Sequence, residues 1–470
     1  MKSIKTDIIP SKSTYFGNKD FVDQKAICVF AATGFFLDDD TYFKEQKVLK
    51  PASKYALNEL NDSVESCNPY FKWHYTPKER PLSQIVSEFA LLFEKIIEEQ
   101  VGNKKVILPL SGGLDSRTQA AALAYLKKNV QAYSYEFENG HNETKYAEQI
   151  AKVCGFPFQK WIIPKGYLWN NIEHIAEING CYTEFTHPRQ AAVLEKFQTM
   201  GDVFNLGHWG DVLFDDMKVP EDLSFEKQVD ILYKKVLKKG GMELAVSLWK
   251  SWNIEGDFAD YLRTRIELLH KQINISTSAN AQIRAFKSLY WAPRWTAVNL
   301  TFFEAVKPVT LPYFDNRMCE FICSVPEKYL ANRQIQIEYI KLRNPGLAKI
   351  TWQDQRPFNL YNYKWNHSPW NIPYLIIQKI KREWITKNTV RNNYENQFFG
   401  DSNDAYLQQW LFENDEFRSF INSELVHEFY TKFKTKNPLL YSHPVSTLLT
   451  LSLFCKLKGN EKYDLLMEIF

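Results

Sequence analysis

The chain has 470 residues and a mass of 55.2 kDa, a length typical of two or three domains of about 100–200 residues each. Hydrophobic residues make up 45% and charged residues 24%, with a net charge of only +3, which excludes a wholly disordered chain and a strongly basic surface for nucleic acid or anionic membranes. We expect a cytoplasmic protein with reduced thiols, because the N-terminus lacks an apolar signal core, no apolar run is long enough to span a bilayer, and seven cysteines do not make a disulfide framework in a chain of this length.

The predicted elements begin with short strands and turns over residues 26–57, where no helical period is visible. The first expected helix is Leu82–Gln100, in which apolar residues recur at every third or fourth position. Strands and helices then alternate. The expected strands are Lys105–Leu110, Val130–Phe137, Phe158–Ile163 and Asp202–Leu206, and the expected helices are Leu114–Lys128, Glu143–Cys154, Leu168–Asn179 and Pro188–Met200. This alternation predicts an α/β fold, a parallel sheet with helices on both faces, and a mostly helical region follows from about residue 225.

The most informative segment is Ser111-Gly112-Gly113-Leu114-Asp115-Ser116, between an expected strand and an expected helix. The two glycines allow the backbone to turn tightly and approach a ligand, and the following helix begins with N–H groups that favour an anion. Both serines add hydroxyl donors for phosphate oxygens, and Asp115 suits a Mg²⁺ ion that bridges phosphates. The segment therefore predicts a phosphate-binding loop at the carboxyl end of a strand. The alternative is a Gly-Gly turn with incidental serines.

These residues resemble the pyrophosphate-binding loop of the N-type ATP pyrophosphatases, in the form found in the asparagine synthetase family. The resemblance implies a fold like that of the adenine nucleotide α-hydrolases, with ATP and Mg²⁺ as cofactors. It also implies that Leu110 and the six loop residues bind ATP, and that Tyr135, in a segment similar to the family's second strand, holds the adenosine. The signatures GxxxxGK[ST], GxGxxG, HExxH and GxSxG are absent.

A second segment, Gly207-His208-Trp209-Gly210-Asp211-Val212-Leu213-Phe214, follows the last expected strand and resembles the family's GEGADELF segment. On this resemblance Gly207 and His208 contact the nucleotide, and Asp211 is a metal ligand together with Asp115. His208 and Val212 stand where the family pattern has acidic residues, so the metal site carries fewer negative charges. The alternative for Asp211 is an acid in a solvated loop.

Farther along, Leu311-Pro312-Tyr313-Phe314-Asp315 resembles the family's PFLD turn. The family's catalytic Glu and Arg correspond here to Pro308 and Thr310, which puts the amide-forming step in doubt or reassigns it to another residue such as Glu304. The stretch Pro345–Arg356 resembles the family's region that supplies a cation to the departing pyrophosphate. Lys349 and Arg356 are the candidates for that role, and surface cations are the alternative for each. The segment Trp291–Trp295 is interpreted as core and not as a stacking surface.

Amidotransferase members of the family carry a Cys nucleophile at the mature N-terminus, whereas this chain has Lys2, and its nearest thiol is Cys28. We interpret residues 1–78 as a truncated, β-rich, non-catalytic remnant of the glutaminase domain. Residues 79–360 are then the ATP-pyrophosphatase synthetase domain, and residues 361–470 a helical C-terminal extension.

The resemblance implies an ATP-dependent ligase that adenylates a carboxylate, releases pyrophosphate and forms an amide with ammonia or an amine. The expected partners are a small carboxylic acid and the nitrogen donor, with a separate amidotransferase as one source of ammonia, and without nucleic acid or membrane. Two alternatives stay open: a relative that adenylates a carbonyl, as RNA-thiolating enzymes do, and a catalytically degenerate nucleotide-binding protein.

Overall fold

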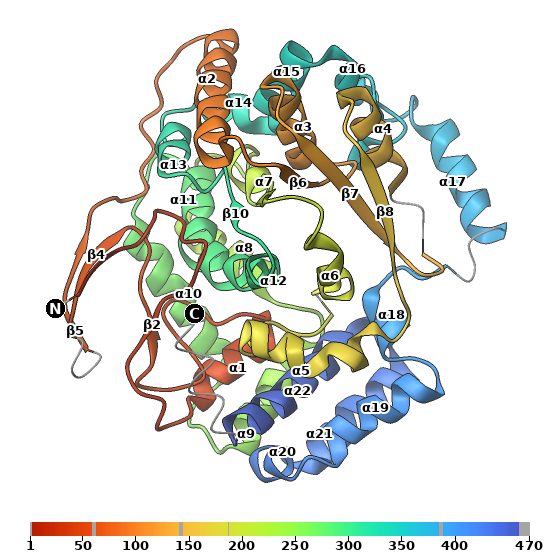
Figure 1. Ribbon diagram of the computed structural model, residues 1–470. Coiled ribbons are helices and arrows are strands. Elements are labelled where there is room, and N and C mark those ends of the chain that lie inside the picture. Colours follow the sequence, from red (N-terminus) through yellow and green to blue (C-terminus); the bar gives the residue numbers. More distant parts are fainter. Residues whose placement is uncertain (1, 59–62, 141–143, 187, 385–388, 460–470) are drawn as a thin grey trace.

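The computed structural model describes residues 2–58, 63–140, 144–186, 188–384 and 389–459. Its centre is a five-stranded parallel sheet in the order β10-β9-β6-β7-β8 (Figure 1). The strands are β6 (Val106–Pro109), β7 (Val130–Phe137), β8 (Phe158–Ile163), β9 (Val203–Asn205) and β10 (Val309–Thr310). The four strands predicted from the sequence are therefore all present, and helices lie around the sheet as expected.

The path of the chain through the sheet explains where a ligand site can form. From β6 the chain moves outward to β7 and β8 through the helices α3 (Asp115–Tyr125) and α4 (Thr144–Cys154), and it then returns to the other side of β6 to form β9. Because crossovers between parallel strands are right-handed, this reversal places the connecting helices on opposite faces. The loops that leave β6 and β9 diverge at this point, which leaves a crevice at the carboxyl ends of the two strands.

Helices surround the sheet and form the remainder of this part of the chain. Near α3 and α4 lie α2 (Leu82–Val101), α15 (Gln334–Arg343) and α16 (Pro345–Ala348). The connection from β8 to β9 contains α5 (Tyr167–Asn179), the 3-10 helix η1 (Arg189–Val193) and α6 (Leu194–Phe197). The helical region that follows contains α7 (Gly210–Leu213), α8 (Phe225–Val236), α9 (Gly241–Ser251), α10 (Phe258–Ile273), α11 (Ala279–Phe286), the π-helical segment η2 (Lys287–Thr296), α12 (Ala297–Glu304), α13 (Asn316–Ile322), α14 (Glu327–Leu330) and the 3-10 helices η3 (Ala331–Arg333), η4 (Gln353–Gln355) and η5 (Tyr363–Trp365).

The N-terminal region differs from the expectation at one element. The sequence predicts only strands and turns over residues 26–57, but α1 (Gln24–Thr33) is a helix. The helix begins after Asp23, and the Asp23 side chain accepts a hydrogen bond of 3.0 Å from the N–H of Ala26. Every residue from Ala26 to Thr33 is buried. A helix that is buried on all sides has no polar face, and its sequence therefore shows no helical period.

Two other predicted elements differ in detail. The expected helix over 188–200 is divided into η1 and the single turn α6. The expected start of a helix at Glu143 lies outside the described residues, and α4 is described from Thr144.

The strands of the N-terminal region form two small antiparallel sheets, as predicted for a β-rich segment. One contains β1 (Lys2–Lys5), β4 (Ser53–Asn58) and β5 (Ser63–Pro69), and the other contains β2 (Tyr15–Phe16) and β3 (Lys47–Val48). The C-terminal region is helical, with α17 (Ile372–Trp384), α18 (Asn393–Gln397), α19 (Asp401–Phe412), α20 (Asp415–Phe420), α21 (Ser423–Thr431), the π-helical turn η6 (Lys432–Lys436) and α22 (Pro438–Lys458). None of the helices described is both long and apolar enough to cross a bilayer.

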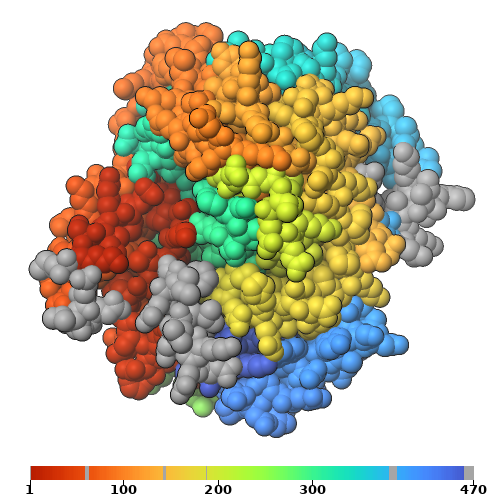
Figure 2. Space-filling view, viewed as in Figure 1, coloured from red at the N-terminus to blue at the C-terminus, as the bar shows by residue number. Residues whose placement is uncertain are grey.

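One hydrophobic core joins the three regions. The ring of Tyr42 stacks on that of Phe454 with 3.9 Å between the ring centroids, and the Tyr42 hydroxyl donates a hydrogen bond of 2.5 Å to the carbonyl of Cys181. In the space-filling view the C-terminal helices (blue) lie directly against the segment around residues 160–200 (yellow) (Figure 2). The domain boundaries at 78 and 360 stay a prediction, but the packing shows that the parts are not separated by a linker.

Candidate functional site

A cleft of about 440 Å³ opens where the loops after β6 and β9 diverge. It brings together six of the residues predicted for the site, namely Ser111, Asp115, Ser116, Gly207, His208 and Asp211. The other lining residues are Trp209, Val212, Lys287, Trp291, Trp295 and Thr296. We call Ser111–Ser116 the phosphate loop, and Trp209, Lys287, Trp291 and Trp295 the tryptophan wall.

The phosphate loop is a tight turn that continues directly from the sheet. The N–H of Leu110 still donates to the carbonyl of Tyr133 (2.8 Å), after which the N–H of Ser111 donates to Ser116 Oγ (3.1 Å). The N–H of Gly113 donates to Ser111 Oγ at 3.3 Å. The first N–H groups of α3 have no acceptor within the helix, and such a helix start stabilises an anion.

Gln353, in η4, contacts the loop from the other side. Its Oε1 accepts a hydrogen bond of 3.1 Å from the N–H of Gly112, and a Cβ atom added at Gly112 would lie 2.5 Å from that oxygen and 2.8 Å from Gln353 Cβ, which cannot turn away as the amide can. Position 112 therefore requires glycine for this close approach. A phosphate oxygen at the same N–H would replace the amide oxygen of Gln353 as acceptor.

Arg117 holds the phosphate loop against the segment after α16. Its side chain is fully buried, and its guanidinium donates hydrogen bonds to four carbonyl oxygens. The acceptors are Gly112 (3.0 Å), Thr351 (2.9 Å), Ile350 (3.0 Å) and Leu347 (3.4 Å). Burial lowers the pKa of Arg117 to about 10, so the group is charged at neutral pH. A buried cation needs such hydrogen-bond partners. These four hydrogen bonds tie the phosphate loop to the segment after α16.

Asp115, the first residue of α3, is tightly enclosed. Its Oδ1 accepts hydrogen bonds from Arg333 and from Gln336 Nε2 (3.1 Å). Gln336 Nε2 also donates to the hydroxyl of Tyr313 (2.7 Å), which places the Leu311–Asp315 motif beside Asp115. A Cβ atom at Gly210 would lie 2.3 Å from Asp115 Oδ1. The backbone after β9 therefore passes directly over this carboxylate, and only glycine fits there.

The surroundings of Asp115 change its acidity. Burial raises the pKa of Asp115 from 3.8 to about 6; the positive charge of Arg333 opposes the shift, and the neighbouring Asp211 carboxylate adds to it. Two carboxylates together with phosphate oxygens are a ligand set that Mg²⁺ accepts, because this ion is often held by one or two carboxylates and its substrate's phosphates. The donor set thus fits the ion predicted from the sequence. Among the residues described, no group of three or more His, Cys, Asp and Glu side chains could hold a metal by itself.

His208 is a neutral group in the cleft. Burial lowers the pKa of His208 to about 4, against the opposing charge of Asp211. Its ring packs edge-on against Phe303 with 6.2 Å between the centroids, and its Nδ1 is buried without a hydrogen-bond partner among the described residues. The residue that replaces a family acid therefore adds a polar atom but no charge.

The tryptophan wall carries the one lysine that lines the cleft among the residues described. Lys287 Nζ lies 5.7 Å from the ring centroids of both Trp209 and Trp291. Burial lowers the pKa of Lys287, and the charge of Asp211 opposes this. The prediction that Trp291–Trp295 belongs to the core holds in part: its two tryptophans are half-buried and pack against the core, and they also line the cleft. Pro293 cannot donate to the helical ladder, and the segment is wound as a π-helix.

Several predicted residues do not line the cleft. Leu110 and Leu114 are buried, so a ligand reaches them only through the backbone. Tyr135 lies on β7, opposite Trp161 of β8. Lys349 and Arg356 are exposed and flank Gln353, which does contact the phosphate loop. Their predicted roles in binding adenosine and pyrophosphate stay predictions.

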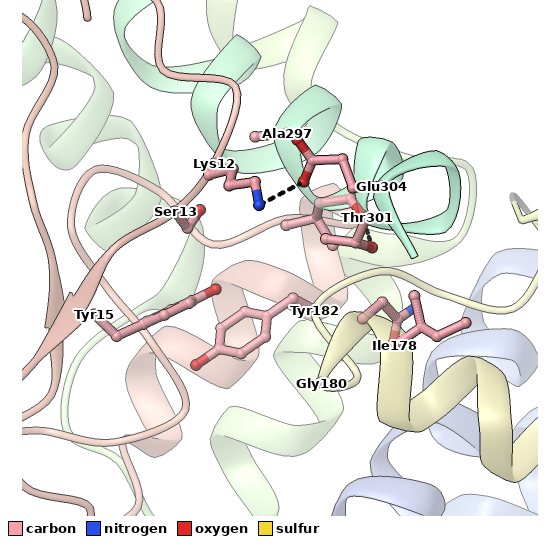
Figure 3. Close-up of a pocket in the computed structure, with 11 residues that line it drawn as sticks. Lys12, Ser13, Tyr15, Ile178, Gly180, Tyr182, Ala297, Thr301 and Glu304 are labelled. Carbon is pink, nitrogen blue, oxygen red and sulfur yellow. Dashed lines mark hydrogen bonds and ion pairs between the residues drawn. The ribbon is translucent and has the colours of Figure 1, made fainter. Parts of the chain in front are cut away.

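Glu304 lies in a different and much smaller pocket of about 30 Å³ (Figure 3). Its Oε2 is 3.5 Å from Lys12 Nζ, and burial raises the pKa of Glu304 against the opposing charge of this lysine. Thr296 lines the cleft and Ala297 lines the small pocket, so the start of α12 stands between them. The structure does not bring Glu304 together with the phosphate loop, and its catalytic role stays a prediction.

The fold and the site define a parallel-sheet α/β protein with a phosphate loop at the point where the strand order reverses. Residues 88–195 match the family model described as asparagine synthase, a range that includes the phosphate loop. This segment is therefore similar to the synthetase domain of the asparagine synthetase family. The match supports, in general terms, the activity of an ATP-dependent amidation ligase. A search of curated proteins gave no match to the chain.

The most informative residues that sequence reasoning missed are charged or amide side chains in apolar surroundings. Arg117 lies in the Ala-rich helix α3, and the sequence does not distinguish a buried arginine there from an exposed one. Lys287 precedes the tryptophan pair, which was itself interpreted as core. Arg333, Gln336 and Gln353 reach the site from loops and helix starts, and no spacing in the sequence identifies them.

Proposed function

We propose that the chain is an ATP-dependent ligase that adenylates a carboxylate, releases pyrophosphate and forms an amide with ammonia or an amine. The observation that carries the proposal is the cleft at the reversal point of the parallel sheet, which is lined by Asp115 and both serines of the phosphate loop together with Asp211. The asparagine synthase domain at 88–195 supports the same class of reaction.

In the first step a carboxylate oxygen of the acid attacks the α-phosphorus of ATP, and the bond to the pyrophosphate oxygen breaks. The N–H groups at the start of α3 and the hydroxyls of Ser111 and Ser116 would bind the departing pyrophosphate, whose charge they stabilise. Arg117 keeps the loop in place through Gly112. In the second step the nitrogen donor attacks the acyl carbon of the adenylate, and AMP leaves. Catalysis of this kind depends mainly on positioning and electrostatics.

Asp115 and Asp211 would hold the metal ion that accompanies ATP, and such an ion neutralises phosphate charge. Arg333 and Gln336 fix the direction of the Asp115 carboxylate by binding its Oδ1. Because Asp115 binds the ion only when ionised, the raised pKa of this carboxyl makes binding sensitive to pH near 6.

The nitrogen donor in this proposal is ammonia or an amine, with a separate amidotransferase as one source of ammonia. Cys28, the thiol nearest to the position of the family's nucleophile, is fully buried in α1, and burial strongly raises its pKa. A protonated, buried thiol is not a nucleophile. The N-terminal region is then a non-catalytic part of the molecule, which packs on the synthetase domain.

The test is an ATP–pyrophosphate exchange assay across a panel of carboxylic acids. Acid-dependent formation of labelled ATP from labelled pyrophosphate supports adenylation. A chain that binds ATP but catalyses no exchange with any acid is instead the degenerate nucleotide-binding protein, which the replacement of family residues by Val212 and Pro308 favours.

A further inference from the structure

We infer, resting on the proposed function, that the acid activated in this cleft has an apolar, planar body and no ammonium group beside its carboxylate. Arylalkanoic acids such as 3-phenylpropanoic acid and indole-3-acetic acid represent this class. Zwitterionic amino acids, aspartic acid included, fall outside it. The inference depends on the residues of the tryptophan wall and on the charges that the cleft contains.

The charges are the first argument. Among the described residues that line the cleft, only Asp115, Asp211 and Lys287 are charged. Asp115 already binds Arg333, and both carboxylates are assigned to the metal ion and phosphates of the proposed reaction. No further carboxylate among the described lining residues remains for a substrate ammonium group. Burying such a group without a counter-charge is costly, so the cleft disfavours an amino acid.

The two positions where the family pattern has acidic residues, His208 and Val212, also carry no negative charge here. His208 is neutral because burial lowers its pKa to about 4, and Val212 is an apolar side chain with 3% of its surface exposed. Lys287 adds a positive charge between two tryptophan rings, which repels an ammonium group and attracts a carboxylate. The cleft thus selects an anion without a cation attached to it.

The shape and chemistry of the wall are the second argument. Trp291 and Trp295 are half-buried, so each presents part of an apolar ring to the cleft, while the buried Trp209 and Val212 lie deeper. Flat apolar walls bind a planar apolar body through burial of surface and ring stacking.

The experiment measures binding and exchange separately with the purified full-length chain. Calorimetry with Mg²⁺ and a non-hydrolysable ATP analogue compares 3-phenylpropanoate, indole-3-acetate, phenylalanine and aspartate. We expect 3-phenylpropanoate to bind at least about 100-fold more tightly than phenylalanine, because the two differ only by an ammonium group that the cleft leaves uncompensated. Indole-3-acetate, which also lacks an ammonium group, should bind more tightly than phenylalanine as well. The same order is expected for kcat/KM in the exchange assay.

Two variants and one control locate the effect. Trp291→Ala should weaken 3-phenylpropanoate binding about tenfold while the affinity for the ATP analogue stays the same. His208→Glu should restore a negative charge and reduce the preference for 3-phenylpropanoate over phenylalanine at least about tenfold. Trp365→Ala removes an exposed tryptophan outside the cleft and should change neither value.

The outcomes separate the inference from the proposed function. Tighter binding of aspartate or phenylalanine overturns the inference, even if exchange is observed. A loss of ATP-analogue affinity in Trp291→Ala that matches the loss of acid affinity also overturns it, because the wall would then hold the adenine. Arylalkanoate binding without any exchange supports the inference about the wall and contradicts the proposed reaction.

Discussion

The phosphate loop and the tryptophan wall enclose the same cleft but are built in different ways. The phosphate loop is polar: its carbonyl at Gly112 accepts a hydrogen bond from Arg117, and its N–H groups donate to Gln353 and to its own serines. The tryptophan wall is mostly apolar, and its side chains come from the loop after β9 and the π-helical η2. One side is therefore fixed by specific polar contacts and the other by packing.

This difference separates chemistry from specificity. Phosphate groups are the same whatever the acid, so a loop that binds them requires fixed N–H groups and a fixed carboxylate. The partner acid contacts the other side, where a change of a few side chains alters what fits without disturbing the phosphate site. Substitutions in the phosphate loop should thus reduce turnover with every acid substrate. Substitutions in the tryptophan wall should change the binding of only some acids.

The largest effect is expected for Asp115→Asn. The substitution keeps the size of the side chain and removes the charge that would bind the metal ion, so ATP turnover should fall at least about 100-fold with every acid. Circular dichroism should show an unchanged fold. Asp401→Asn is the matched control, since Asp401 is also the first residue of a helix but is exposed on α19. Wild-type turnover in Asp115→Asn would exclude the metal role.

Arg117→Met should have the largest effect on stability. It leaves four carbonyl oxygens without their buried donor, and we expect the free energy of unfolding in urea to fall by about 3 kcal/mol. Arg418→Met, which removes an exposed ion pair with Asp415, should cost less than about 1 kcal/mol. Equal losses in the two variants would show that Arg117 does not hold the loop.

A smaller effect is expected for Gly210→Ala. Its added Cβ atom would lie 2.3 Å from Asp115 Oδ1, so either the carboxylate or the backbone after β9 must move. We expect about tenfold weaker binding of ATP with Mg²⁺, measured by calorimetry. Gly459→Ala places its Cβ atom no closer than 3.6 Å to other atoms and should leave binding unchanged. An unaffected Gly210→Ala would contradict the close packing of the two loops.

The smallest effect concerns pH. Because burial raises the pKa of Asp115 to about 6, kcat/KM for ATP should be constant at high pH, fall to about half at pH 6 and decrease further below it. Stability should change with pH in the opposite direction to activity. Because the pKa of Asp115 is higher in the folded than in the unfolded chain, its contribution to the free energy of unfolding decreases as pH rises from 3.8 to about 6 and is constant above.

His208 provides the control for the pH profile. Since its pKa is lowered to about 4, it is neutral throughout the range from pH 5 to 8. His208→Gln should therefore change the height of the profile but not its midpoint. A midpoint that disappears in this variant would assign the titration to the imidazole and not to Asp115.

The sheet and the phosphate loop could be predicted from the sequence because both depend on local patterns. The strands Val130–Phe137 and Phe158–Ile163 have the predicted bounds, since each is a short segment rich in aromatic and β-branched residues. The position of Ser111–Ser116 between strand and helix follows from the same pattern, as does the neighbourhood of Asp115 and Asp211 at the carboxyl ends of β6 and β9.

The remainder of the site depends on contacts between distant parts of the chain. Arg117 contacts residues more than 200 positions away, and Arg333 reaches Asp115 across a similar separation. Helix α1 was missed because a fully buried helix has no amphipathic period. The sequence also does not show that the tryptophans of η2 line a cleft, because a tryptophan that lines a cleft and one that fills a core occur in the same apolar sequence context.

The most direct test of the central claim is the identity of the nucleotide product. The purified chain is incubated with ATP, Mg²⁺, ammonium and an acid that supports exchange, and the products are separated by anion-exchange chromatography. The account predicts AMP and pyrophosphate in amounts that match the amide formed, because the phosphate loop binds pyrophosphate and the sequence has no Walker-type lysine motif. ADP and inorganic phosphate as the main products would contradict it.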